Sequence, residues 1–477
     1  MSKRATTRWT FVVVSVAVFM ASLDNLIVTT ALPVIKMELG ATLQGLQWTV
    51  NAYTLTFAVL LLSGAALGDR FGRKRMFLVG MSIFTAGSAL AALAPSVGLL
   101  IAARAVQGVG GAIVTPLTLT ILSAAVPPAR RGLALGVWSG VGCLAIAIAP
   151  LVGGAIVESF SWQWIFWLNV PIGLALLPIA WRRVEETKGP NRALDMPGVG
   201  LASTGLFGIV WGLVGSDTVG WTNIGVAGPI AAGVTLVGLF VWWEARSRTP
   251  MVPMRFFRRR AFSTANATSM LMSFGMFGSV FLLAQFFQIV QQYSPLQAGL
   301  RTLPWTAMPI LAAPLAGLLS DRLGSRPLLV SGMGLMAGAL AWIASVVSPT
   351  VPYAALVAPF ALGGIGMSLF FAPVANVVLS AVRRDEEGKA SGVNNTVREV
   401  GGVFGVAVLA SVFAAVGGYA SPSAFADGLN AALWVGAAVV GLGTLAAFGI
   451  PGRKAVVSQA AILQLAGNAG GLENSTL

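Results

Sequence analysis

Long apolar stretches recur along the whole chain, and short polar segments separate them. An α-helix rises about 1.5 Å per residue, so about 20 apolar residues cross a hydrocarbon core about 30 Å thick. Fourteen stretches have about this length, and each is predicted to be a membrane-spanning helix. They lie at Trp9–Pro33, Leu46–Leu67, Met76–Ala94, Val97–Ala124, Gly132–Val157, Gln163–Trp181, Pro197–Gly215, Ile224–Trp243, Phe262–Gln288, Ala298–Leu319, Pro327–Val347, Pro352–Ala381, Ser391–Val416 and Gly428–Ile450. The pattern predicts an all-α polytopic membrane protein.

Composition agrees with this fold class and narrows the possible chemistry. Of the 477 residues, 56% are hydrophobic and 10% are charged, and the mean hydropathy is +0.83. A soluble domain carries about 25% charged residues, so a water-soluble globule is excluded. The absence of histidine and the single cysteine, Cys143, exclude histidine-ligated metals, Ser-His catalytic sets, a Cys-only zinc site and an intramolecular disulfide. We expect no enzymatic activity, no metal and no cofactor, and any acid–base chemistry must fall to carboxylates.

Basic residues are distributed unequally between the two sides of the predicted membrane. When the loops are assigned to alternate sides, all but four of the 30 Lys and Arg residues fall on the side that holds the N-terminus. The exceptions are Lys36 and Arg301 on the opposite side, and Arg104 and Arg398 inside spans. By the positive-inside rule both termini are cytoplasmic. The net charge of +14 is explained by this orientation rather than by nucleic acid binding, because the bases are spread over short loops.

The chain contains an internal duplication. Asp69-Arg70-Phe71-Gly72 follows the second span, and Asp321-Arg322-Leu323-Gly324 follows the tenth. Four glycines also match four later ones at one constant offset: Gly108, Gly110, Gly132 and Gly136 correspond to Gly364, Gly366, Gly388 and Gly392. We therefore expect two six-helix bundles that flank a central cavity, the architecture of alternating access.

The duplication sets the expected domain boundaries. The N-terminal bundle covers residues 1–181 and the C-terminal bundle residues 261–450. Residues 182–260 form an insert with two further spans and basic cytoplasmic loops. Residues 451–477 form a cytoplasmic tail that is expected to be disordered, because its end is polar and rich in small residues.

Several runs of residues resemble the signatures of one transporter family. The run Leu67–Arg75 (LGDRFGRKR) resembles the loop 2–3 signature of the major facilitator superfamily. Four further runs resemble motifs of its fourteen-span drug:proton antiporters of the EmrB/QacA type. They are Leu23–Pro33 in span 1, Arg104–Gly110 in span 4, the antiporter motif Ala149–Gly154 with Pro150, Gly153 and Gly154 in span 5, and Trp162–Gly173 at the start of span 6.

This resemblance implies a fold and a function. It implies a major facilitator fold with two extra central helices in a bacterial-type plasma membrane, acting as a proton-coupled exporter of amphipathic or drug-like small molecules. The protein would bind its substrate, protons and membrane lipid, and it would act as a monomer. The proton gradient would be its energy source. An endogenous lipid, siderophore or secondary metabolite is the alternative cargo, and a proton-coupled importer is less favoured. An ATP-driven pump is not supported, because the chain has no G-x-x-x-x-G-K-[ST] sequence.

Four charged residues lie clearly inside predicted spans: Asp24, Arg104, Arg398 and Glu399. A charge at the bilayer centre costs about 2.5–3.5 kcal/mol on insertion scales, so each calls for a partner or a function. Asp24 and Arg104 lie at similar depths from the outer ends of their spans, and we predict that they share one polar site, directly or through water or Asn25.

The predicted role of this site is proton exchange. Burial raises the pKa of a carboxyl group and a neighbouring guanidinium lowers it, so a small rearrangement can load or release a proton. Asp24 is expected to hold a proton when substrate is absent and to release it inward as substrate binds. The alternative is a static ion pair that joins spans 1 and 4.

Neighbouring helix residues point in different directions, so Arg398 and Glu399 are not expected to satisfy each other. Two roles stay open for Glu399. It either faces the cavity as a second titratable group or belongs to a latch on the cytoplasmic side.

The resemblance also implies such a latch. Asp69 would meet the start of span 13, near Gly388–Ser391, because a helix N-terminus favours negative charge. Arg70 and Arg73, on either side of Gly72, would complete a latch that holds the outward-open state. Asp321, Arg322 and Gly324 would supply a reduced counterpart. Simple inside-positive anchoring is the alternative for the basic residues of this loop.

The antiporter motif of span 5 is expected to bend or seal the interface between the bundles. Pro150 removes a backbone donor and bends a helix, and Gly153 and Gly154 permit close packing. Ordinary packing of membrane helices is the alternative.

Overall fold

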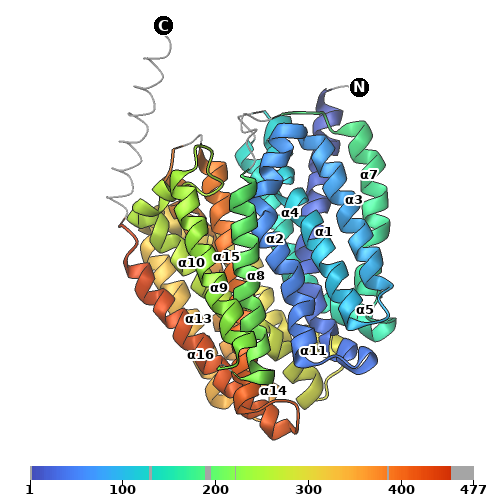
Figure 1. Cartoon of the computed structure of the whole chain (residues 1–477), viewed down its shortest axis with the longest axis vertical. Coiled ribbons are helices and arrows are strands. Elements are labelled where there is room, and N and C mark those ends of the chain that lie inside the picture. Colours follow the sequence, from blue (N-terminus) through green and yellow to red (C-terminus); the bar gives the residue numbers. More distant parts are fainter. Residues whose placement is uncertain (1–2, 128–130, 189–194, 221, 384–385, 453–477) are drawn as a thin grey trace.

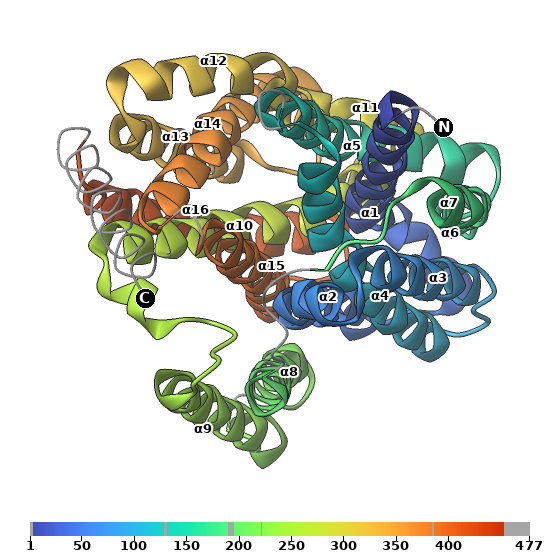
Figure 2. The same cartoon turned by 90° about the horizontal axis from the view of Figure 1, so that it is seen from above.

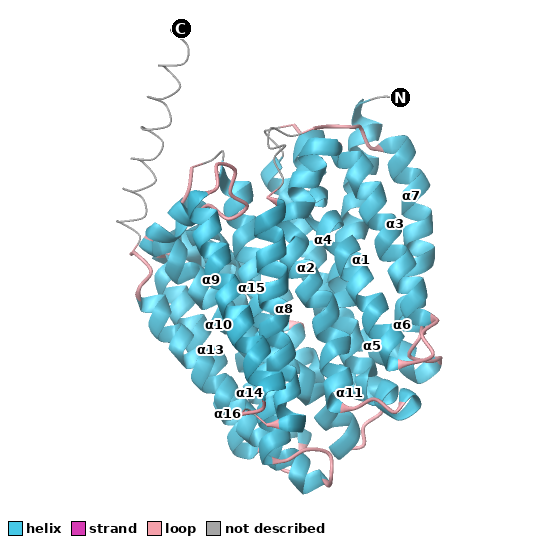
Figure 3. Cartoon of the chain, in the orientation of Figure 1, coloured by secondary structure: helices cyan, strands magenta, loops and turns pink. Residues whose placement is uncertain are grey.

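The computed structural model describes residues 3–127, 131–188, 195–220, 222–383 and 386–452. Within these ranges the chain consists of helices joined by short loops, without a β-strand (Figure 3). The helices are α1 (Lys3–Leu39), α2 (Leu43–Phe71), α3 (Arg73–Ala92), α4 (Val97–Ala125), α5 (Arg131–Ser159), α6 (Trp164–Trp167), α7 (Asn169–Arg183), α8 (Met196–Val219), α9 (Ile224–Arg246), η2 (Met254–Arg258), α10 (Arg260–Gln285), η3 (Phe286–Val290), α11 (Pro295–Thr306), α12 (Met308–Leu323), α13 (Ser325–Val346), α14 (Tyr353–Ser380), α15 (Glu387–Val416) and α16 (Pro422–Phe448). The tail predicted to be disordered lies outside the described residues from position 453 onward.

In the described part of the chain, thirteen helical segments are long and apolar enough to cross a membrane. They correspond to thirteen of the fourteen predicted spans. The remaining predicted span, Ala298–Leu319, is not one continuous helix. It is divided at Ala307 into α11 and α12. Pro304 and Pro309 flank the break, and a proline ring lacks the N–H and collides with the preceding helical turn. The predicted all-α membrane fold is confirmed, with the tenth span divided into α11 and α12 and the sixth into α6 and α7 at Leu168.

The two halves of the chain lie side by side, and α8 and α9 stand outside them (Figure 2). Helix α8 packs against α2 of the first half and α15 of the second. Helix α9 packs on α8 and is otherwise largely exposed, with apolar side chains such as Val234, Leu239 and Trp242 on its surface. An exposed apolar helix is what a lipid environment covers, because all its backbone hydrogen bonds are internal.

Repeated glycines make equivalent contacts in the two halves. Gly72 joins α2 to α3 with φ +109°, and Gly324 joins α12 to α13 with φ +85°, a region that favours glycine. A Cβ on Gly108 would lie 2.5 Å from the Tyr53 carbonyl oxygen of α2. A Cβ on Gly364 would lie 2.5 Å from the Trp305 carbonyl oxygen of α11. The duplicated sequence therefore produces the same turn and the same close helix crossing twice.

The two ends of the molecule differ. At the end opposite to the start of α1, here called the far end, α5 packs on α11 and α1 on α10. The Gln288 side-chain amide donates to the Thr30 carbonyl (2.9 Å), and the Leu296 N–H donates to the Glu158 carboxylate (3.0 Å). At the termini-side end, where α1 begins (uppermost in Figure 1), a cavity of about 910 Å³ lies between α2, α4 and α5, the start of α15 and the segment after α9. The halves are joined at the far end, whereas the cavity lies partly between them at the termini side.

Candidate functional site

The structure brings Asp24 of α1 and Arg104 of α4 together directly. The Arg104 Nη1 donates to Asp24 Oδ2 at 2.6 Å and to Gln107 Oε1 at 2.7 Å. The second carboxylate oxygen, Asp24 Oδ1, accepts from Gln107 Nε2 and from Asn169 Nδ2, both at 2.7 Å. Gln107 also donates to the Ser88 hydroxyl (2.8 Å). Helices α1, α3, α4 and α7 thus meet at one carboxylate with three donors.

This pair is fully enclosed by the first half of the protein. Asp24 is 1% exposed and Arg104 0%. The guanidinium lies over the Tyr53 ring, 4.3 Å from its centroid, and its Nε donates to the Thr49 carbonyl (3.2 Å). A buried ion pair is retained only when further hydrogen bonds satisfy it, and removing one partner leaves an uncompensated charge. Neither Asp24 nor Arg104 lines the termini-side cavity, so the carboxylate is occluded in this conformation.

The uncharged members of this network were not singled out from the sequence. Gln107 and Asn169 lie within the span 4 and span 6 motifs, and Gln107 is one helical turn after Arg104. That spacing puts both side chains on one face of α4, which is the signal that could have identified Gln107. Asn25, a candidate bridge, is not part of the network: its Oδ1 is buried without a hydrogen-bond partner in the described structure.

The expectation that Arg398 and Glu399 do not satisfy each other is wrong. Arg398 Nη2 donates to Glu399 Oε1 at 3.3 Å. The Cα–Cβ bonds diverge, but the long arginine side chain folds back far enough to reach its neighbour. Glu399 is 3% exposed, and its Oε2 has no partner in the part of the chain that the structure describes. Glu399 lies on α15, which packs on α2, the helix that carries Tyr53.

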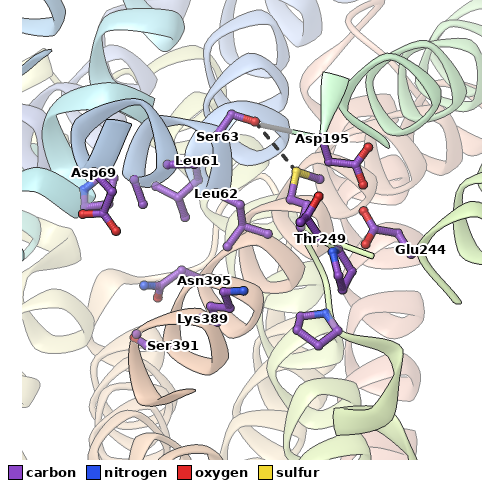
Figure 4. A pocket seen from close by; sticks show the side chains of 18 of the residues that line it. Leu61, Leu62, Ser63, Asp69, Asp195, Glu244, Thr249, Lys389, Ser391 and Asn395 are labelled. Atoms are coloured by element: carbon purple, nitrogen blue, oxygen red, sulfur yellow. Dashed lines mark hydrogen bonds between the residues drawn. The ribbon is translucent and has the colours of Figure 1, made fainter. Parts of the chain in front are cut away.

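The expected latch is not engaged in this structure. Asp69 Oδ1 accepts from Arg73 Nε at 3.0 Å and from Arg73 Nη2 at 2.9 Å, across the turn at Gly72. Asp69 and the start of α15 line the same cavity, and Figure 4 shows Asp69 apart from Lys389 and Ser391. Arg70 lies over the Phe71 ring, 5.1 Å from its centroid. The expected contact between Asp69 and α15 is absent because the cavity separates them.

The counterpart loop of the second half is described only in part. Arg322 lies in the last turn of α12 and is exposed, and Gly324 forms the turn to α13. The side chain of Asp321 lies outside the described residues.

A carboxylate that the sequence analysis did not identify caps the helix after the latch turn. Glu186 accepts from the backbone N–H groups of Lys74 (3.0 Å) and Arg75 (3.1 Å). The Arg73 N–H donates to the Thr187 carbonyl (2.8 Å). A carboxylate is stabilised at a helix N-terminus by the unpaired N–H groups and the helix dipole. The segment that leads from α7 to the insert is thereby tied to the latch loop.

The span 5 motif lies where the two halves meet at the far end. A Cβ on Gly154 would lie 2.3 Å from the Pro295 carbonyl oxygen of α11. On the other side of the contact, a Cβ on Gly299 of α11 would lie 2.2 Å from the Pro150 carbonyl oxygen. Gly153 faces α1, where a Cβ would lie 2.3 Å from the Thr30 hydroxyl oxygen. These residues allow backbone-to-backbone contact between the halves.

Comparisons with known proteins agree with these features. The family model described as Major Facilitator Superfamily matches residues 14–406. The Multidrug resistance protein Stp of Mycobacterium tuberculosis (strain CDC 1551 / Oshkosh) is 35% identical over 85% of this chain and 76% of its own length. The Tetracenomycin C resistance and export protein of Streptomyces glaucescens is 34% identical over 88% of this chain and 78% of its own. The Multidrug efflux pump LfrA of Mycolicibacterium smegmatis (strain ATCC 700084 / mc(2)155) is 33% identical over 84% and 80%.

Solved structures share the fold. An auto-inhibited POT family peptide transporter aligns with a TM-score of 0.66 and 17% identity, over 96% of this chain and 97% of that one. The xylose transporter XylE from E. coli, in an inward open conformation, aligns with a TM-score of 0.64 and 13% identity, over 95% and 98%. The chain is therefore an integral membrane protein of the major facilitator superfamily, and within it belongs to the drug:proton antiporter family.

Proposed function

We propose that this protein is a proton-driven exporter of amphipathic or drug-like small molecules that works by alternating access. The observation that carries the proposal is the occluded Asp24–Arg104 pair with its Gln107 and Asn169 donors, in a protein that also holds a cavity of about 910 Å³ at the termini-side end. Relatives named as drug resistance and export proteins support the direction of transport.

In the proposed orientation the cavity lies on the cytoplasmic side of a bacterial plasma membrane and both termini are cytoplasmic, which the asymmetry of basic residues supports. In this orientation the structure is the inward-open state. The bundles 1–181 and 261–450 rock against each other, and the insert 182–260 follows them on the outside. The far end opens when the Gly154 and Gly299 contact separates, and the cytoplasmic latch of Asp69, Arg70 and Arg73 then docks on α15.

Asp24 is the proton carrier in this scheme. Arg104, Gln107 and Asn169 all donate to its carboxyl oxygens in this state, so a proton that leaves Asp24 leaves a carboxylate that is paired with Arg104. When the far end opens, protonation of Asp24 from outside removes its charge and frees the Arg104 guanidinium. Glu399, which is buried and has one oxygen without a partner in the described structure, serves as a second titratable group.

The lining of the cavity suits an amphipathic molecule. Apolar side chains such as Leu62, Leu119 and Trp138 alternate with acidic and basic ones such as Asp69 and Lys389. The protein acts as a monomer in lipid, needs no cofactor beyond the proton gradient and catalyses no reaction. An endogenous lipid, siderophore or secondary metabolite is the alternative cargo.

Transport into inside-out vesicles tests this function. We expect the vesicles to accumulate a fluorescent amphipathic dye when their lumen is acidified, and a protonophore to abolish accumulation while ATP depletion leaves it unchanged. Accumulation that follows ATP, or that occurs only in right-side-out vesicles, would contradict proton-driven export. Lack of dye transport together with proton-driven movement of a lipid or metabolite fraction would support the alternative cargo.

A further inference from the structure

Two acidic residues that the proposed transport cycle does not use meet at the base of the insert. Asp195 caps the start of α8, where its Oδ1 accepts from the Gly198 N–H (2.9 Å) and from Trp243 Nε1 (2.8 Å). Glu244 lies in the last turn of α9, and its Oε2 accepts from the Val252 N–H (3.1 Å). Asp195 is 8% exposed and Glu244 2%. One oxygen of each carboxyl group therefore accepts hydrogen bonds from protein donors.

The other two oxygens lie beside Gly198 without a donor in the described structure. Asp195 Oδ2 and Glu244 Oε1 are buried and have no hydrogen-bond partner in the described structure. Both lie over Gly198, where a Cβ would be 3.0 Å from Asp195 Oδ2 and 2.8 Å from Glu244 Oε1. The two oxygens therefore approach the same point beside the first turn of α8, and Figure 4 shows the two side chains together at one end of the pocket. Two buried carboxylate oxygens that approach one point without a donor are unfavourable when both groups are ionised, because like charges repel and neither oxygen is hydrogen-bonded.

The number of free oxygens limits which cation can bind between the two carboxyl groups. Calcium takes about 6–8 oxygen ligands and magnesium about six in an octahedron, whereas only two oxygens are free here. No group of three possible metal ligands exists among the described residues. An organic ammonium group in the adjoining cavity does not contact these two oxygens, because both atoms are buried. A proton needs only two acceptors. We propose that Asp195 and Glu244 form a proton-binding site that holds one proton between their carboxyl groups.

The nearby charged groups do not supply this donor. The bases that line the same cavity are Arg73, Arg248, Arg255 and Lys389, and its third acid is Asp69. Arg73 is paired with Asp69, and Arg255 with Glu386. On α9 itself, Arg246 lies over the Trp242 ring, 4.5 Å from its centroid. None of these groups is hydrogen-bonded to the two free oxygens.

The bound proton closes a clasp, defined here as Asp195, Glu244 and the Val252 N–H. The clasp joins α8, α9 and the segment 247–253 that leads to the second half. Met251 in this segment accepts a hydrogen bond from the Ser63 hydroxyl of α2 (3.7 Å). Loss of the proton leaves two like charges in a buried site, so the clasp opens as the cytoplasmic pH rises. This property of the insert goes beyond the proposed export and does not depend on Asp24.

Infrared titration of the full-length protein in lipid nanodiscs tests the site. We expect a protonated carboxyl band, distinct from any band of Asp24, that disappears as the pH rises and that is absent from both Glu244→Gln and Asp195→Asn. The band stays in Glu185→Gln, whose carboxylate is exposed, and in Asp24→Asn. A band that persists in both clasp variants overturns the proposal. Because Asp24→Asn lacks the proposed proton carrier but keeps Asp195 and Glu244, a band that remains in this variant supports the clasp even if the transport mechanism is wrong.

Hydrogen exchange at the Val252 amide tests the consequence. Its protection factor should fall at least about tenfold between the low-pH and high-pH forms of the native protein. Glu244→Gln should keep the protection at both pH values, because its amide donates to Asp195 while its carbonyl accepts from Val252. Glu244→Ala should lose protection at both. A native protection factor that does not depend on pH overturns the clasp.

Discussion

Replacement of Arg104 by glutamine is expected to lower the free energy of unfolding by about 3–5 kcal/mol, because it leaves the Asp24 carboxylate buried without its counter-ion. Arg104 is 0% exposed and donates to Asp24, Gln107 and the Thr49 carbonyl, so water cannot take its place without rearrangement of α4. Thermal unfolding of the purified protein in detergent measures the effect.

A second substitution distinguishes the destabilisation caused by the buried Asp24 charge from that caused by the lost packing of the Arg104 side chain. Asp24→Asn added to Arg104→Gln should recover a large part of the lost stability, since the double variant buries no net charge, but it should not recover proton coupling. Arg326→Gln, at an exposed arginine, is the matched control and should leave stability unchanged. A double variant that is less stable than Arg104→Gln alone would show that the pair is not electrostatically coupled.

Gly154→Ala is expected to shift the protein toward the state that is open at the far end. The added Cβ would lie 2.3 Å from the Pro295 carbonyl oxygen, and backbone on both sides of the contact cannot move aside. Overpacking of this kind costs about 1–3 kcal/mol, which corresponds to about a 5–150-fold change in the ratio of two conformations. The shift is measured in a Cys143→Ser background with a cysteine introduced at Thr302, which lines a small far-end cavity. The rate at which a membrane-impermeant reagent labels this cysteine reports how often the far end is open.

Gly140→Ala is the control for this experiment. Gly140 lies on the same helix, and a Cβ there meets no atom within 4 Å. We expect faster labelling and weaker transport for Gly154→Ala only. Equal labelling rates in the two variants would contradict the role of α5 as the far-end seal.

Most of the fold was accessible from the sequence because the length of an apolar run sets the number of crossings. The exception, Ala298–Leu319, contains Pro304 and Pro309, and membrane helices tolerate proline often enough that its presence does not predict a break. The repeated glycines were informative because close helix crossings need small residues, and Gly108 and Gly364 occupy equivalent crossings.

The site was predictable where charge had to be buried, and less so elsewhere. Asp24 and Arg104 stood out as charges at equal depth, whereas Gln107 and Asn169 are uncharged and carry no comparable insertion cost. The error at Arg398 arose because backbone direction does not limit the reach of a long side chain. The contact between Asp69 and α15 depends on which end is open, which sequence does not specify. Glu244 was missed because an acid near a helix end is usually solvated.

The central claim, that Asp24 exchanges its proton for substrate, is tested most directly by recording lumen pH in inside-out vesicles while substrate is added outside. The native protein should release protons from the lumen upon substrate addition, and Asp427→Asn, at an exposed aspartate, should behave in the same way. Asp24→Asn should bind substrate with similar affinity but release no protons. Proton release from Asp24→Asn vesicles equal to that of the native protein would contradict the account.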